Sequence, residues 1–131
     1  MKIDLKQKLA KQWFKNLQEI VCKNIEEIEN NKVLFKSKKW TRNKKKNEGG
    51  GESKILESGK IFDKVGVNFS EVYGKFPNKM KGKIPGTKKN TKFWATGISI
   101  VMHMKNPHVP AMHFNTRYIN TSHGWFGGGM D

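Results

Sequence analysis

The N-terminal part of the chain carries apolar residues at the spacing of an amphipathic α-helix. From Asp4 to about Glu29 they recur every three to five positions, which predicts a helix with one apolar stripe. Asp4 and Gln7 have the spacing of a capping box at its start, and Asn30-Asn31 ends it. We expect the stripe to pack on a sheet; its members are Leu5, Leu9, Trp13, Leu17, Ile20 or Val21, Ile25 and Ile28.

The middle of the chain has the composition of β-strands separated by turns. Lys54–Leu56 and Lys60–Phe69 are predicted strands on either side of a turn at Ser58-Gly59. Gly66 indicates a bulge or a close backbone approach in the second of them. The basic, Gly-rich stretch 41–51 is predicted to be a loop.

Two further strands are predicted within residues 93–117, after a Pro-, Gly- and Lys-rich loop over 75–90 that has room for a short helix. The connection between them, MKNPHVPAM, contains two prolines, which cannot continue a regular ladder. The predicted fold class is therefore α+β. It comprises an N-terminal helix packed on a mainly antiparallel sheet, within a single domain over residues 1–131.

Polar side chains along these two strands are predicted to share one face, because residues two or four apart in a strand point the same way. A hairpin centred on His108 would place His103 opposite His113 and Ser99 opposite Arg117. A surface strand needs no such set, so we interpret it as a site. Its members are Ser99, His103, His113, Asn115 and Arg117.

The charge of the chain favours an anionic partner. Lys and Arg number 26 against 11 Asp and Glu, a formal net charge of +15. That charge fits nucleic acid or a small polycarboxylate. The lysine clusters lack interleaved aromatic residues apart from Trp40, which disfavours nucleic acid. Arg117 is one of only two arginines, and its planar fork suits a carboxylate or a phosphate.

Cysteine content and hydropathy indicate the compartment. A single cysteine, Cys22, cannot form an internal disulfide, which favours a reducing environment. No apolar run approaches the ~18 residues of a membrane span, and the N-terminus lacks the apolar region of a signal peptide. We expect a cytoplasmic protein with no membrane partner.

Two sets of residues have more than one interpretation. His103 and His113 are candidate metal ligands, acid–base groups or simple hydrogen-bonding residues, and as ligands they fill only half of a four-ligand shell. Asp131 is the nearest acidic residue. The GGG runs at 49–51 and 127–129 fit no phosphate-binding fingerprint. They are Gly-rich turns or, at 127–129, a place where the backbone approaches a large flat ligand.

The motifs taken together resemble a known family. WTR followed by GGG, then GKIFDKVGVNFSEVYG, FWATGISIVMHMKNPHVPAMHFNTRY and WFGGGMD, closely resemble oxygen-dependent coproporphyrinogen III oxidase, from about Trp13 to the last residue. The resemblance implies oxidative decarboxylation of two propionates of coproporphyrinogen III to the vinyls of protoporphyrinogen IX, in haem biosynthesis. It implies molecular oxygen as electron acceptor and no organic cofactor. A divalent metal, with manganese suggested, is associated with some bacterial members.

The resemblance also implies residue roles. His103 and His113 match histidines assigned to a divalent metal, and His113 also matches the proton donor. Asp131 matches an acidic residue near the pyrrole nitrogens. The implied substrate-binding positions are Ser99, Asn115, Thr116 and Arg117.

Family chains are more than twice as long, form homodimers and have a larger sheet with helices on both faces. We therefore expect an N-terminal portion of the family fold, inactive and aggregation-prone on its own. Two alternatives stay open at this point: a basic nucleic-acid-binding module and a non-catalytic porphyrin-binding remnant.

Overall fold

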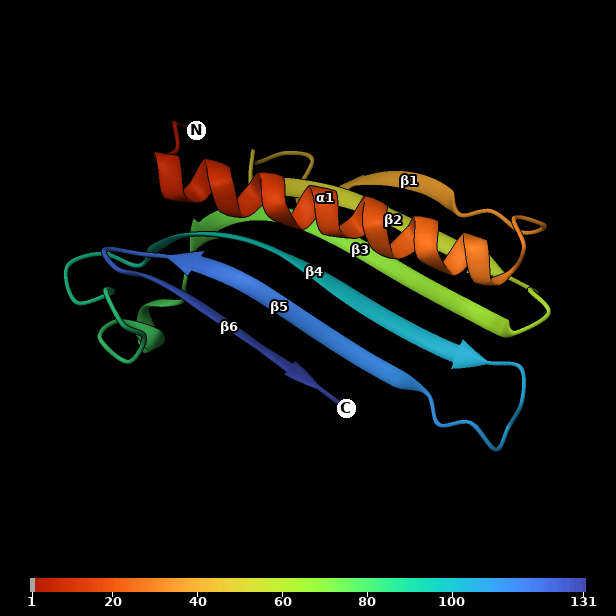
Figure 1. Ribbon diagram of the computed structural model, residues 1–131. Coiled ribbons are helices and arrows are strands. Elements are labelled where there is room, and N and C mark those ends of the chain that lie inside the picture. The colour runs from red at the N-terminus through yellow and green to blue at the C-terminus, as the bar shows by residue number, and fades with distance from the viewer. Residues whose placement is uncertain (1) are drawn as a thin grey trace.

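The computed structural model describes residues 2–131 and shows one α-helix across a six-stranded antiparallel sheet (Figure 1). Each strand pairs with its neighbour in sequence, in the order β1-β2-β3-β4-β5-β6. The predicted α+β class is confirmed. The elements are α1 (Leu5–Ile28), β1 (Lys36–Thr41), β2 (Gly49–Glu57), β3 (Phe62–Lys75), η1 (Asn78–Met80), β4 (Lys92–Met104), β5 (Met112–Asn120) and β6 (Gly124–Met130).

The ends of α1 lie where the sequence predicts them. Asp4 accepts a hydrogen bond from the Gln7 backbone N–H at 2.8 Å, and the Gln7 side chain accepts one from the Asp4 N–H at 2.8 Å. This reciprocal pair is a capping box. At the other end Asn30 and Asn31 both adopt a φ of 56°, a left-handed conformation that stops the helix.

The predicted packing face of α1 was correct only in part: Leu17, Val21 and Ile25 pack on the sheet as expected, but most of the stripe does not. The helix buries Gln7, Ala10, Phe14, Gln18, Cys22 and Ile25, whereas Leu5 and Trp13 are 69% and 52% exposed. Gln18 makes this orientation possible, because its Nε2 donates to the backbone oxygens of Glu52 and Val67 at 2.9 and 3.0 Å. A buried amide with both donors satisfied carries little penalty. Most of the apolar stripe therefore lies outside the core, at Leu5, Leu9, Trp13, Ile20 and Ile28.

The strands are longer and more regular than the sequence suggests. Residues 49–51 begin β2 instead of lying in a loop, and residues 127–129 pair with β5. The irregularity in β3 falls between Phe62 and Lys64, while Gly66 pairs regularly with Ile55 and Val101. The short helix expected within 75–90 is present as η1.

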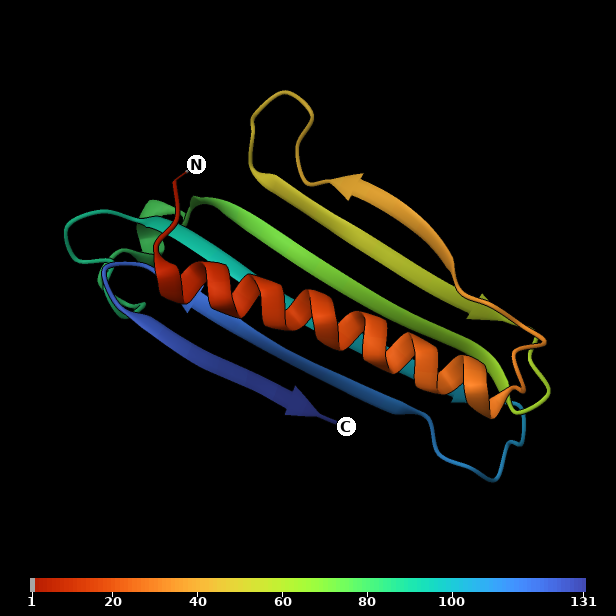
Figure 2. The same cartoon turned by 45° about the horizontal axis from the view of Figure 1, so that its top comes forward.

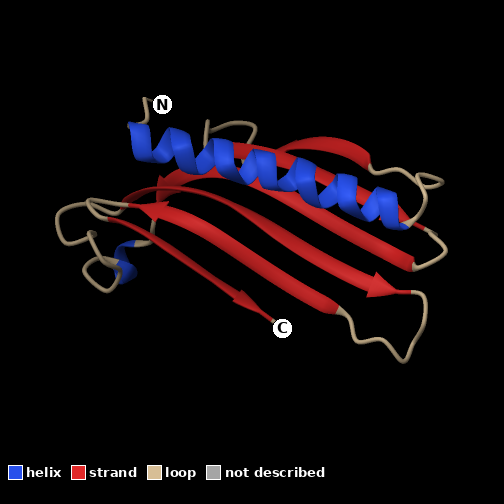
Figure 3. Cartoon of the chain, in the orientation of Figure 1, coloured by secondary structure: helices blue, strands red, loops and turns tan. Residues whose placement is uncertain are grey.

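The sheet has two unequal faces. Figure 2 shows α1 running across the middle strands, with β6 and the β1–β2 hairpin extending beyond it on opposite sides, and Figure 3 shows the same layers by element type. On the face that α1 covers, Phe14 belongs to a core of buried residues that includes Val67 of β3 and Ile98 of β4. Among residues 2–131 no α-helix other than α1 covers either face, and no helix is long and apolar enough to cross a membrane.

A buried carboxylate ties the end of α1 to the β2–β3 turn. Glu29 is 4% exposed and accepts hydrogen bonds from the backbone N–H groups of Lys60, Ile61 and Phe62 at 2.5, 2.6 and 3.2 Å. Burial alone would raise the pKa of this carboxyl, but these donors and the charge of Lys105 outweigh it and lower the pKa. The ionised carboxylate thus fixes helix and sheet relative to each other.

The substitution Glu29→Gln should lower the free energy of unfolding by about 1–3 kcal/mol, because the three backbone N–H groups of the β2–β3 turn lose a charged acceptor. Since the folded state lowers the pKa of Glu29, its stabilisation is present above the ordinary carboxyl pKa and is lost as the pH falls through the folded value. Urea unfolding of wild type and variant at pH 7 and pH 3 measures this. The exposed Glu27→Gln is the matched control. An equal effect of both variants at pH 7 would contradict the assignment.

Candidate functional site

The predicted polar side chains lie on the face of the sheet that α1 leaves uncovered, which we call the open face. Ile98 and Ile100 of β4 are buried on the α1 side, so Ser99 between them points the opposite way. His103 shares the direction of Ser99. Through the strand pairing, the open face also contains His113, Asn115 and Arg117 of β5. The sequence therefore predicted the shared face correctly.

The predicted pairing within the hairpin was wrong by two positions. Ser99 lies opposite Asn115, Val101 opposite His113, and Gly97 opposite Arg117. The last residues of β4 pair only with β3, and the Lys105 N–H donates to the Ile61 oxygen at 2.9 Å. The end of β4 thus pairs with β3 and not with β5. A shift of two residues preserves the face, which is why the set stays together.

Thr116 does not join the open-face set. It lies between Asn115 and Arg117 on β5, opposite Ile98, and strand alternation directs its side chain to the α1 side. Of the three consecutive residues implied in substrate binding, the open face therefore presents the side chains of Asn115 and Arg117.

The two residues implied in catalysis lie directly opposite each other. The backbone groups of His113 and Asp131 exchange two hydrogen bonds, at 2.7 and 2.8 Å between nitrogen and oxygen. Residues in such a pair have side chains on the same face. Both residues are exposed, so the imidazole and the carboxylate border the open face at its β5–β6 edge.

His103 and His113 are diagonal neighbours, because Val101 occupies the position opposite His113. Imidazole and carboxylate groups suit divalent transition metals. Within residues 2–131, however, no three His, Cys, Asp or Glu side chains come together as a metal site. These residues therefore do not form a complete metal site by themselves, and the metal stays a prediction.

Arg117 and Asn115 border a shallow hollow of about 180 Å³ on the open face. The Arg117 Nη2 donates to the Asn115 Oδ1 at 3.2 Å. The hollow lies at Gly97, which pairs with Ser70 of β3 on one side and with Arg117 of β5 on the other. Gly97 itself is buried, and a Cβ atom there would lie 2.9 Å from the Arg117 Cβ. Ser70 was missed by the sequence interpretation, although its spacing from Asn68 shows that both share a face.

A second polar cluster on the open face was also missed. Trp40 of β1, Ser53 of β2 and Asn68 of β3 come together there. The Asn68 Oδ1 accepts hydrogen bonds from the Trp40 Nε1 at 2.9 Å and the Ser53 Oγ at 2.8 Å. These residues are far apart in the sequence, and no local motif connects Trp40 with Asn68.

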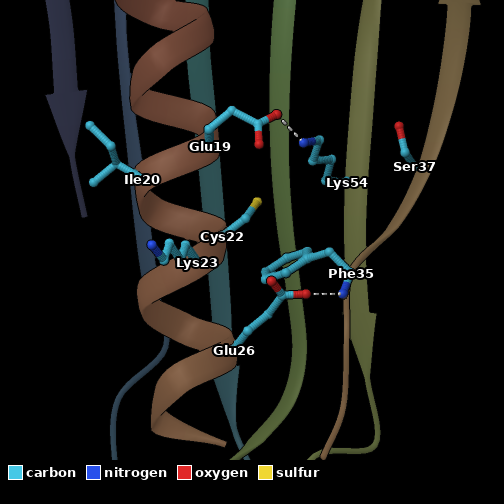
Figure 4. Close-up of a pocket in the computed structure, with 8 residues that line it drawn as sticks. All are labelled: Glu19, Ile20, Cys22, Lys23, Glu26, Phe35, Ser37 and Lys54. Carbon is cyan, nitrogen blue, oxygen red and sulfur yellow. Dashed lines mark hydrogen bonds and ion pairs between the residues drawn. The ribbon is translucent and has the colours of Figure 1, made fainter. Parts of the chain in front are cut away.

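A larger hollow, about 450 Å³, lies on the other face between α1 and β1–β2 (Figure 4). Three of its charged groups already have partners: Lys54 pairs with Glu19, and Glu26 accepts a hydrogen bond from the Phe35 N–H at 2.9 Å. Burial raises the pKa of the Cys22 thiol to about 12, so the thiolate nucleophile is scarce at neutral pH. We therefore place the candidate site on the open face.

The comparisons with known proteins agree with the motifs. The family model for coproporphyrinogen III oxidase matches residues 9–131. The chain belongs to the coproporphyrinogen III oxidase family. It is 47% identical to proteins named oxygen-dependent coproporphyrinogen-III oxidase from Rickettsia felis and Rickettsia akari, over the whole chain and 48% of each relative. The Rickettsia bellii protein of that name is 48% identical over 91% of the chain and 44% of the relative. The chain thus spans about half the length of the curated relatives it matches.

The glycines of β6 should respond differently to a methyl group according to the face they occupy. Cβ atoms at Gly127 and Gly129 would meet no atom within 4 Å, whereas one at Gly128 would lie 2.3 Å from the Asn115 oxygen. Gly129→Ala should therefore change the free energy of unfolding by no more than ~1 kcal/mol, and Gly128→Ala should lower it by about 1–3 kcal/mol. Thermal unfolding measures both. If both variants are destabilised equally, other atoms occupy the space on the open face beside Gly129.

Proposed function

We propose that this chain provides one wall of the substrate site of an oxygen-dependent coproporphyrinogen III oxidase, and that the open face is that wall. The observation that carries the proposal is the grouping of Ser99, Asn115 and Arg117 beside His113 and Asp131 on one uncovered face. Family membership over residues 9–131 supports the reaction class. The substrate is a flexible tetrapyrrole that carries four carboxylates.

Charge and shape support this substrate class. A formal net charge of +15 attracts a polycarboxylate over a distance and raises its rate of encounter. At close range Arg117 offers a carboxylate two parallel N–H donors. Gly127 and Gly129 on β6 leave open backbone beside these donors, where a planar pyrrole ring can approach.

The proposed chemistry needs an acceptor for pyrrole N–H groups and a proton donor. Asp131 can accept a pyrrole proton, which makes the ring electron-rich enough to react with oxygen, and returns that proton to the pyrrole nitrogen afterwards. His113 opposite it is the proposed donor of the proton that the reduced oxygen takes up. For each propionate the side chain loses carbon dioxide and becomes a vinyl group. Its two electrons reduce oxygen to hydrogen peroxide, with one proton taken from the medium. The balance is –CH2CH2COO⁻ + O2 + H⁺ → –CH=CH2 + CO2 + H2O2.

Three properties extend the proposal. His103 and His113 are the proposed ligands of a divalent metal such as manganese, and no step above depends on it. Homodimer formation is supported by exposed apolar side chains on α1 and β6, namely Leu5, Leu9, Trp13, Phe126 and Met130. A cytoplasmic location is supported by the unpaired, buried Cys22.

Arg117→Gln should weaken binding of coproporphyrin III, the stable oxidised analogue of the substrate, about 10- to 100-fold, because a charge-assisted carboxylate contact is lost. Fluorescence titration of the 131-residue chain measures this. Lys8→Gln on α1 removes the same charge away from the open face and should change affinity less than twofold. If the two variants bind alike, Arg117 is not the carboxylate clamp.

Asp131→Asn should slow oxygen consumption with coproporphyrinogen III by at least ~10²-fold in a catalytically active polypeptide that contains these residues, since a general base is lost. An oxygen electrode measures turnover, and the exposed Asp63→Asn is the control. Near-normal turnover of the Asp131 variant would rule out this carboxylate as the base. Tetrapyrrole binding with no oxygen consumption by the unaltered polypeptide would instead favour a non-catalytic role.

A further inference from the structure

The side-chain amide of Asn68 has a fixed orientation on the open face. Its Oδ1 accepts hydrogen bonds from the Trp40 Nε1 at 2.9 Å and from the Ser53 Oγ at 2.8 Å. An indole nitrogen can only donate, so the atom that faces it must be the amide oxygen. The Nδ2 group, with two donors, is thereby directed away from Trp40 and Ser53. It has no acceptor among residues 2–131.

The side-chain amide of Asn115, on the strand that pairs with Ser99 opposite Asn68, also has a fixed orientation. The Arg117 guanidinium can only donate, and it occupies the Asn115 Oδ1 at 3.2 Å. Both amides therefore present NH2 groups. Strand pairing places Asn68 directly opposite Ser99, and Ser99 directly opposite Asn115. Their Cβ atoms are about 4.5–5.5 Å apart from one strand to the next.

A purely structural role for Asn68 would use only its oxygen, which accepts from residues of two other strands. That role does not explain the two free N–H groups of the Asn68 Nδ2. Asn68 is half-buried, and a half-buried amide with unused N–H groups favours an acceptor from a ligand. An acceptor placed between Asn68 and Ser99 would meet N–H and O–H donors together. A carboxylate, with two oxygens and no proton to donate, fits these donors best.

We propose that Asn68 and Ser99 form a second carboxylate-binding subsite, and that Trp40 and Ser53 act as positioning residues that hold the Asn68 amide in its donor orientation. This subsite rests on the proposed function, because its ligand is a second propionate of the tetrapyrrole whose first propionate is held by Arg117. Asn68 on β3 and Arg117 on β5 are two strand spacings and two residues along the strand apart, about 12 Å in all. One ligand with several carboxylates can engage both.

Asn68→Asp is the decisive variant. The Asp oxygen can still accept hydrogen bonds from Trp40 and Ser53, so the fold is kept, while a negative charge replaces the NH2 donor. Asn90→Asp is the matched control. Asn90 lies in the loop before β4, and its Oδ1 accepts from the Lys92 N–H at 3.0 Å, a bond that Asp retains. Both variants lower the net charge by the same amount.

The experiment is a fluorescence titration of the 131-residue chain with coproporphyrin III and with its tetramethyl ester, whose carboxylates are masked. Asn68→Asp should weaken binding of the free acid at least about tenfold, and Asn90→Asp less than twofold. Both variants should have the melting temperature of the unaltered chain within a few degrees. Trp40→Phe, which removes the indole donor but keeps an aromatic ring, should weaken binding by a smaller factor because the amide is free to turn.

The outcomes separate the two proposals. If the unaltered chain binds neither porphyrin, or binds acid and ester equally, the proposed function fails and the subsite fails with it. If the chain prefers the free acid and Arg117→Gln weakens binding, but Asn68→Asp behaves like Asn90→Asp, the subsite alone is overturned. If Asn68→Asp lowers affinity for acid and ester alike, the residue has a structural role and the carboxylate contact is ruled out.

Discussion

The site depends on the alternation of side chains in an unbroken antiparallel sheet that a helix covers on one face only. Because β1 to β6 pair in chain order, open-face residues from all six strands align in rows across the sheet. Gln18 and Glu29 hold α1 against the opposite face through bonds to backbone groups of the sheet. The core thus lies on one face of the sheet and the candidate site on the other.

Alternation also explains which features the sequence could predict. The helix bounds, the α+β class and the common face of Ser99, His103, His113, Asn115 and Arg117 follow from local spacing, which the backbone preserves. The register of the β4–β5 hairpin does not follow from spacing, because Lys105 at the end of β4 bonds to Ile61 beside β3.

The rest of the packing face of α1 escaped prediction for a related reason. An apolar stripe indicates burial, but the buried side of this helix includes Gln18, whose donors are satisfied by the carbonyls of Glu52 and Val67. Those partners are more than 30 residues away in the sequence. The Trp40–Asn68 bond joins two strands in the same way and has no local pattern. Thr116 shows the opposite effect. It lies between Asn115 and Arg117 in the chain, yet its side chain lies on the other face of the sheet.

We propose that a tetrapyrrole carboxylate ligand binds the open face and not the α1 side. Backbone amide chemical shifts in ¹⁵N-labelled protein, recorded during titration with coproporphyrin III, test it directly. We expect the largest changes at Ser99, Asn115 and Arg117, with Cys22 and Phe14 nearly unchanged. Changes concentrated around Cys22 and Phe14, or spread evenly over both faces, would contradict it.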